Sequence, residues 1–219
     1  MATIELDELP GRLRHVRWLG GGSGAGKSTV ARALATQYGL CVYSTDDVMT
    51  EHARRCPREH APALQAFAAM SMDERWLHRS PQVMLETFHW FRGECFDLIV
   101  EDLLRLPQSP SILVEGFRLL PRLVEPLLTG SRRAVWLLPT PEFRRMAIEA
   151  RGSVWEIAGR TSDPPRALRN LLERDRLFTE RLRKETRRSG LPAIEVVRGM
   201  PPDELSRRVA ATLELGGCR

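Results

Sequence analysis

Short, mainly apolar runs recur along the chain, and each has the length of a strand. They occupy residues 15–19, 41–44, 111–114, 133–138 and 192–197. Longer stretches between them carry apolar residues at helical spacing, such as Val30, Leu34 and Tyr38, which a helix-ending Gly39 follows. Strands that alternate with helices predict right-handed crossovers, and therefore a parallel sheet with helices on both faces.

The segment 51–110 interrupts this alternation and predicts a helical insertion between the second and third strands. Ser71-Met72-Asp73-Glu74 has the pattern of a capping box. Ser80-Pro81 supplies an N-cap and a first-turn proline for a helix that could run to Leu106. Because the insertion is rich in aromatic residues, which suit a flat or apolar ligand, we expect it to bind an acceptor substrate.

Three residues of the insertion are candidates for contact with that substrate: Glu86, His89 and Trp90. An apolar stripe runs beside them along the same predicted helix, formed by Met84, Phe88, Phe91, Cys95 and Leu98. For Phe88 and Phe91, the helical spacing favours a position in the core over contact with a ligand.

Later helices carry clear start signals. Thr140-Pro141-Glu142 combines an N-cap, a first-turn proline and an acid, and Asp163-Pro164 opens an arginine-rich helix through about Arg188. A closing helix is expected over residues 203–213. With no internal repeat or low-complexity linker, 219 residues and 42% hydrophobic composition indicate a single domain over residues 1–219.

Charge is unevenly distributed. The net charge of +5 comes from 31 arginines and two lysines against 28 acids, and the arginine-rich region 141–190 holds a basic surplus of the same size. A local surplus favours an anionic small ligand over a membrane surface or a long nucleic acid, which would need a broader basic footprint.

The four cysteines, Cys41, Cys56, Cys95 and Cys218, have neither C-x-x-C spacing nor zinc-finger spacing with histidine. We expect reduced thiols in a cytoplasmic protein. The acidic start of the chain does not resemble a secretory signal, and no apolar stretch has the length of a membrane span.

The candidate chemistry begins directly after the first strand, in the stretch Gly20-Gly21-Gly22-Ser23-Gly24-Ala25-Gly26-Lys27-Ser28-Thr29. It contains the phosphate-binding pattern Gly-x4-Gly-Lys-Ser, in which backbone N–H groups surround the phosphates. Lys27 is expected to reach the β- and γ-phosphates of ATP, and Ser28 to bind Mg²⁺. The helix that follows adds the positive end of its dipole. Residues 21–29 are therefore the predicted ATP-binding loop.

Acids follow two other strands, at the edge of the sheet where ligands bind. Asp46 and Asp47 come after the second strand, and Glu115 ends the third. Asp46 is a candidate general base, although either aspartate could instead cap a helix. A buried Glu115 needs a metal or an ion-pair partner, for which Arg118 is available. Asp47 and Arg118 are also candidates for substrate contact.

This combination resembles the P-loop kinases of small molecules, among them the uridine, shikimate, gluconate and adenylylsulfate kinases, chloramphenicol phosphotransferase and the zeta-toxin kinases. The loop, Asp46-Asp47, Val114-Glu115-Gly116 and the arginine-rich segment carry the resemblance, which extends over the whole chain without matching one family. It implies a three-layer P-loop NTPase fold with strand order 2-3-1-4-5. It also implies a base at Asp46 close to the Mg²⁺ shell, and a metal or acceptor contact at Glu115.

In such kinases an arginine-rich lid closes on the phosphates, and here the resemblance places it at residues 141–175. Arg151 and Arg160 are the preferred lid arginines for contact with the developing phosphoryl charge. The sequence thus predicts an ATP- and Mg²⁺-dependent kinase acting on a hydroxyl of a nucleoside, metabolite or antibiotic-like compound. The alternatives are a 5′-hydroxyl polynucleotide kinase and a nucleotide-binding ATPase or sensor that acts through a protein partner.

Overall fold

The computed structural model describes the backbone of residues 8–151 and 153–216, and the side chains of residues 8–147 and 156–216. Its centre is a five-stranded sheet in the order β2-β3-β1-β4-β5, in which every neighbouring pair is parallel. The strands are β1 (Val16–Gly21), β2 (Cys41–Ser44), β3 (Ile112–Glu115), β4 (Ala134–Pro139) and β5 (Ala193–Val196). The expected strand order is confirmed, and each strand lies within two residues of its predicted bounds.

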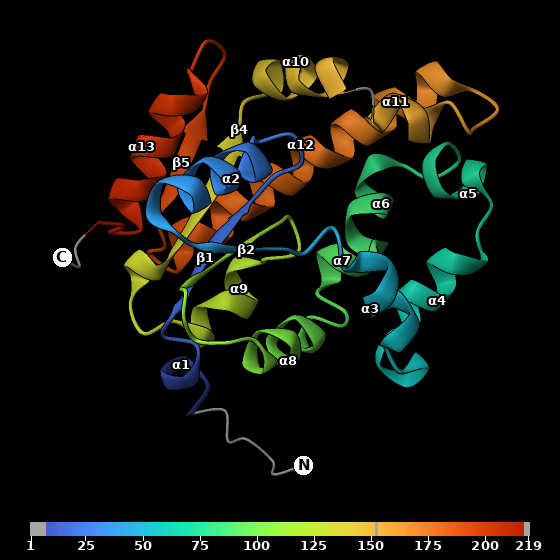
Figure 1. Ribbon diagram of the computed structural model, residues 1–219. Helices are drawn as coiled ribbons and strands as arrows, with labels where there is room; N and C mark the ends of the chain where they lie inside the picture. Colours follow the sequence, from blue (N-terminus) through green and yellow to red (C-terminus); the bar gives the residue numbers. More distant parts are fainter. Residues whose placement is uncertain (1–7, 152, 217–219) are drawn as a thin grey trace.

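Side chains of the inner strands point alternately to two buried layers. Trp18, Val114 and Trp136 belong to one layer, while Leu19 and Val135 belong to the other. Residues of α8 (Asp97–Arg105), α9 (Pro121–Val124) and α12 (Pro164–Arg188) pack in the first layer, and residues of α2 (Lys27–Tyr38) and α13 (Pro202–Thr212) in the second. Burial on both faces explains the nearly continuous apolar runs of the inner strands. The three-layer α/β class is therefore confirmed (Figure 1).

Short helices fill the chain between β2 and β3 and gather at one side of the sheet (Figure 1). In chain order they are α3 (Met49–Arg55), the 3₁₀ turn Arg58–His60, α4 (Pro62–Ala69), α5 (Met72–Trp76), α6 (Pro81–Thr87), α7 (His89–Arg92) and α8. The capping box of α5 and the Ser80 cap of α6 form as predicted.

The prediction of a single helix from Ser80 to Leu106 is wrong, because the helix is interrupted twice. Phe88 is extended between α6 and α7, and Gly93 takes a left-handed conformation with φ of 84° after α7. These breaks send the apolar residues to different partners. Met84 packs in a cluster with α12 residues, whereas Phe91 stacks on Phe178 with 3.8 Å between ring centroids. Helical spacing alone does not reveal such a break when no proline marks it.

Cys56 and Cys95 form a disulfide, so the expectation of reduced thiols is wrong for this pair. Cys56 ends α3 and Cys95 lies between α7 and α8, 39 residues later. Their spacing resembles no known motif, because only the folding of the insertion brings them together. Cys41 is a free, exposed thiol, and Cys218 lies outside the described residues.

The remaining elements are α1 (Leu9–Arg12), the 3₁₀ turns Glu125–Leu127 and Ser131–Arg133, α10 (Pro141–Arg151) and α11 (Ser153–Ala158). The predicted caps of the two later helices form, since Thr140 accepts from the N–H of Phe143 and Asp163 from that of Arg166. Gly152 lies outside the described residues. Within the described part of the chain, no helix combines the length and apolarity that crossing a membrane would require.

Candidate active site

The glycine-rich loop joins the end of β1 to the start of α2, as its pattern predicts. Gly26 has φ of 84°, a left-handed conformation that favours glycine, and it directly precedes Lys27, the first residue of α2. The Lys27 ammonium group donates a hydrogen bond to the Gly22 carbonyl oxygen at 2.9 Å, across the loop. The Lys27 side chain, the loop and the N–H groups at the start of α2 thus form one concave, electropositive site suited to phosphate.

Arg144 of α10 supports this loop. Only 2% of its surface is exposed, and its Nε donates to the Ser23 carbonyl oxygen at 3.4 Å. Its Nη2 donates to the hydroxyl of Thr179 on α12, and that hydroxyl lies so close to Gly22 that a side chain there would collide with it. Burial lowers the pKa of Arg144, and the nearby Asp175 partly offsets this effect. Arg144 therefore anchors the loop to the helices behind it.

Glu115 lies at the end of β3, in register with Leu19 of β1 and Ser44 of β2. It is 2% exposed, and the hydroxyls of Ser28 and Ser44 form hydrogen bonds with it. Burial raises the pKa of Glu115, while the charge of Lys27 acts in the opposite direction. One carboxylate oxygen, Oε2, has no hydrogen-bond partner in the described structure.

Asp46 is exposed to solvent and lines a cavity beside the loop. The surrounding protein reduces its hydration and raises its pKa, and the charge of Lys27 partly offsets this rise. Neither Asp46 nor Asp47 caps α3, because that helix begins at Met49 without a side-chain cap. The capping alternative is therefore wrong for both residues. Asp47 is exposed and does not line the cavity.

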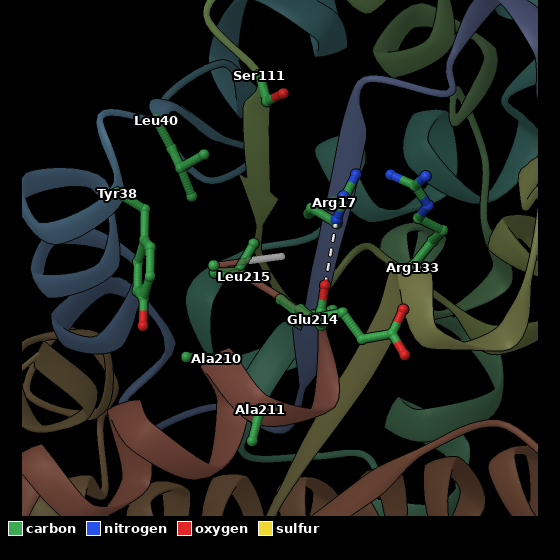
Figure 2. A pocket seen from close by; sticks show the side chains of 11 residues that line it. Arg17, Tyr38, Leu40, Ser111, Arg133, Ala210, Ala211, Glu214 and Leu215 are labelled. Atoms are coloured by element: carbon green, nitrogen blue, oxygen red, sulfur yellow. Dashed lines mark hydrogen bonds between the residues drawn. The ribbon is translucent and has the colours of Figure 1, made fainter. Parts of the chain in front are cut away.

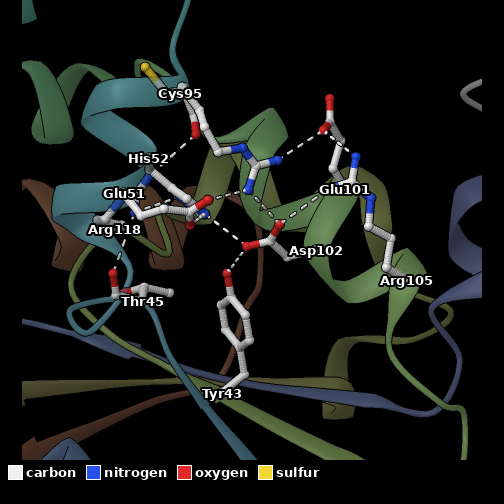
Figure 3. A network of polar contacts seen from close by, with 10 residues as sticks. Tyr43, Thr45, Glu51, His52, Cys95, Glu101, Asp102, Arg105 and Arg118 are labelled. Carbon is white, nitrogen blue, oxygen red and sulfur yellow. Dashed lines mark hydrogen bonds and ion pairs between the residues drawn. The ribbon is translucent and has the colours of Figure 1, made fainter.

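Arg118, expected as a partner of Glu115 or of the substrate, is instead committed to other groups. It is 2% exposed and donates to the carbonyl oxygens of Thr45 and Cys95 at 3.4 and 3.2 Å (Figure 3). It also lies 3.1 Å from His52 Nδ1, and its guanidinium sits 4.0 Å from the Trp90 ring centroid. Burial lowers its pKa to about 10. Arg118 thus joins the segment that carries Asp46 to the insertion.

A polar network continues from Arg118 through His52. Asp102 accepts from the Tyr43 hydroxyl at 2.7 Å and lies 2.8 Å from His52 Nε2 (Figure 3). Glu51, His52 and Asp102 bring three ligand atoms within 4.8 Å of one another, a spacing that a metal ion could use. However, Arg55 pairs with Glu51 and Asp102, and Arg118 faces the other His52 nitrogen, so arginines already supply the positive charge.

The cavity beside the loop has a volume of about 460 Å³ and two unlike halves. One half consists of residues 23–28 with Asp46 and Met49. The other half is an aromatic wall, defined here as Phe67, Trp76, Phe88, His89, Trp90, Phe91 and Phe117. Ile157, Arg174 and Asp175 complete the lining. The fold therefore places the phosphate-binding loop and the aromatic part of the insertion around one continuous space.

Several predicted site residues lie elsewhere. Gly21, Gly22 and Thr29 belong to the loop region but do not line the cavity. Glu86 is exposed and accepts a hydrogen bond from Gln82, and Arg160 is also exposed away from the lining. The side chain of Arg151 lies outside the described residues.

Sequence reasoning missed Asp175 and did not single out Arg174, although both line the cavity from α12. It also missed Phe67 and Phe117, which come from α4 and from the segment after β3. Their only sequence signal is membership of an aromatic or arginine-rich segment, which does not identify the face that a side chain occupies.

A larger cavity of about 700 Å³ lies at the opposite edge of the sheet (Figure 2). Arg17 and Arg133 line it together with Tyr38 and Glu214, and Ser111 lines it just before β3 begins. Arg17 and Ser111 mark the amino ends of β1 and β3, whereas open α/β sheets bind ligands at the carboxyl ends of their strands. The smaller cavity at the loop is therefore the better candidate active site.

The loop and the strand order define the three-layer α/β fold of P-loop proteins. A family model described as an AAA domain matches residues 20–84, from the loop to α6. The match supports the resemblance to P-loop kinase-like domains and singles out no one kinase family. No curated protein sequence matches the chain.

Two solved structures are similar over most of their length. TT1252 from Thermus thermophilus is 21% identical, with 92% of this chain and 98% of that chain covered and a TM-score of 0.49. An uncharacterized protein from Eubacterium ventriosum ATCC 27560 is 15% identical, with 91% and 97% covered and a TM-score of 0.46. At these values neither similarity bears on the activity of this chain.

Proposed function

We propose that this protein is a kinase that uses ATP and Mg²⁺ to phosphorylate a hydroxyl group of a small molecule. The observation that supports this proposal is the single cavity that joins the phosphate-binding loop to the aromatic wall, with Asp46 on its lining. A transferase needs donor and acceptor held side by side in this way, because phosphoryl transfer depends mainly on positioning and charge stabilisation. Residues 51–110 then supply the acceptor side, and residues 141–175 the lid side.

In this mechanism the residues around the loop have separate roles. Lys27 and the N–H groups at the start of α2 bind the phosphates and stabilise the charge that develops during transfer. Asp46 accepts the proton of the acceptor hydroxyl, whose oxygen forms a bond to the γ-phosphorus as the bond to the bridging oxygen of ADP breaks. The raised pKa of Asp46 makes its carboxylate a better proton acceptor than an aspartate of ordinary pKa.

Mg²⁺ fits the oxygen atoms that the fold collects next to the loop. Ser28 and Glu115 are hydrogen bonded to each other, and the second carboxylate oxygen of Glu115 is buried without a partner. Asp46 lies close enough to raise the pKa of Glu115 through its charge. Two acids with a hydroxyl are donors that this hard cation prefers, so Ser28, Glu115 and Asp46 are the residues that would hold it. Mg²⁺ held by these residues would neutralise part of the negative charge of the phosphates.

The aspartate pair offers a matched test. Asp46→Asn is expected to lose at least about 100-fold in phosphoryl transfer, since general-base catalysis contributes that much, while ATP affinity changes little. Asp47→Asn, which alters the exposed neighbour, is expected to keep wild-type turnover. The measurement is ATP consumption with a panel of nucleosides, sugars, vitamins and antibiotic-like alcohols, with Lys27→Ala as the blank. Unchanged turnover of Asp46→Asn would remove its assignment as the base.

The same assay separates the alternative functions. A polynucleotide kinase would respond to oligonucleotides with a 5′-hydroxyl and bind them with a steep dependence on salt. An ATPase or sensor would hydrolyse ATP slowly whichever acceptor is supplied. Acceleration by a small alcohol, retained at high salt and lost in Lys27→Ala, is the result expected for the proposed kinase.

A further inference from the structure

The aromatic wall is assembled from separate parts of the insertion and from the segment after β3. Phe67 lies edge-on to both Trp76 and Phe88, with 5.3 Å between ring centroids in each pair. Phe88 is likewise edge-on to Phe91 at 4.9 Å and stacked with Phe117 at 6.5 Å. Rings that meet at such varied angles offer faces and edges to a planar ligand, whose own ring can stack against them.

His89 is the polar exception in this wall. Its side chain is 3% exposed, and its ring centre lies 5.0, 4.7 and 4.5 Å from the rings of Phe67, Phe88 and Trp90. The Nδ1 atom is buried and has no hydrogen-bond partner in the described structure. Burial, assisted by the charges of Arg118 and Arg75, lowers the pKa of His89 to about 3. At neutral pH the ring is therefore uncharged, with one nitrogen that donates and one that accepts.

An orphaned polar atom at such depth is unusual in a native protein and needs an explanation. In this cavity, a ligand with a polar ring edge would supply the missing hydrogen bond. The arrangement also selects against ligands that have no planar aromatic ring, because a sugar would bury its own hydroxyls against the aromatic faces.

The arginines that contact the aromatic wall already donate hydrogen bonds to protein groups. Arg174 faces the rings of Trp76, Phe88 and Phe91 at 5.2 to 5.4 Å, but Asp175 accepts from its Nη2 and Nε at 2.6 and 2.9 Å. Arg75 donates to two carbonyl oxygens at the end of α4, and Arg118 is held by the polar network. These three guanidinium groups are therefore held by protein groups, and a phosphate group on the acceptor would have to compete with those partners for their N–H donors.

We infer that the acceptor is an uncharged alcohol that carries a planar ring with a polar edge, and that His89 is the residue that hydrogen bonds to this edge. The inference rests on the proposed kinase function and gives the substrate class of the same site. It places the ring against the aromatic wall and the hydroxyl towards Asp46, where the transferred phosphoryl group arrives.

The experiment measures ATP consumption with three matched classes of acceptor. The first contains ring-bearing alcohols, namely hydroxymethylpyridine, a hydroxymethylpyrimidine and cytidine. The second contains alcohols without an aromatic ring, such as ribose and glycerol, and the third contains cytidine 3′-monophosphate, which keeps a free 5′-hydroxyl. We expect kcat/KM to be at least tenfold higher for the best ring-bearing alcohol than for either other class, a difference of about 1.4 kcal/mol.

Variants at His89 then test the assigned contact. His89→Phe is expected to raise KM for the best ring-bearing alcohol at least tenfold with the KM for ATP within about twofold, and His89→Gln, which keeps a donor and an acceptor, to recover part of the loss. His78→Phe, at an exposed histidine outside the cavity, is the matched control. Thermal melts verify that each variant is folded.

The outcomes are distinguishable. Preference for an acceptor without an aromatic ring, or for the phosphorylated acceptor, would overturn this inference and leave the kinase proposal standing. A rise in the KM for ATP instead of the acceptor in His89→Phe would assign the aromatic wall to the adenine ring and also overturn it. Absence of acceleration by every class would overturn the kinase proposal itself, and this inference with it.

Discussion

The low pKa of His89 leads to a stability prediction that needs no substrate. An unfolded histidine takes up a proton near pH 6.5, whereas folded His89 resists protonation down to about pH 3. Between these values the unfolded chain binds more protons, so the free energy of unfolding must fall as the pH falls. With these two pKa values, linkage gives a loss of about 2 kcal/mol between pH 7 and pH 5 from this residue alone.

The His89→Phe variant isolates this effect, because phenylalanine keeps an aromatic ring and does not titrate. Asp46 and Glu115, whose raised pKa values act in the opposite direction, contribute equally to both proteins and cancel in the comparison. Urea unfolding at pH 7 and pH 5 should show that the wild type loses about 2 kcal/mol more than His89→Phe. Equal losses in the two proteins would refute the burial of an uncharged imidazole.

Two further changes test the disulfide and the proposed metal site. Cys56→Ser opens a loop of 39 residues, which in the chain-entropy model costs about 4 kcal/mol of unfolding free energy. Urea unfolding measures that loss, with Cys41→Ser as a control expected to change stability little, and equal stability of both variants would contradict a structural disulfide. Glu115→Gln should raise the Mg²⁺ concentration for half-maximal activity by about tenfold or more without loss of stability, since it removes a buried carboxylate of raised pKa. An unchanged Mg²⁺ requirement would exclude Glu115 from the metal site.

Some functional geometry followed from local sequence because its causes are local. The loop after the first strand and the helix that follows it appear as predicted, and the left-handed Gly26 between them is a conformation that favours glycine. Gly116 has one local and one tertiary cause: its φ is 150°, and a side chain there would collide with Thr45 of the segment after β2. The roles of Asp46 and Glu115 remain predictions, although the structure removes the capping alternative and the Arg118 pair.

Other features depend on which faces of distant elements meet. The choice of Arg151 and Arg160 followed a general lid pattern, whereas the structure brings Arg144 to the loop and Arg174 to the cavity. Every arginine of that region has similar local surroundings in the sequence. Only the direction of α10 and α12 against the sheet decides which of them is buried at the site.

Local residue patterns were enough to predict the glycine-rich loop, the strands and the class of sheet, because turn chemistry and burial on two faces constrain residue types directly. Tertiary packing produces the helix breaks in the insertion, the Cys56–Cys95 disulfide and the enclosure of His89 by aromatic rings. These features join residues that lie far apart in the chain or on opposite sides of a helix break. They follow from packing, which a pattern of single residues does not contain.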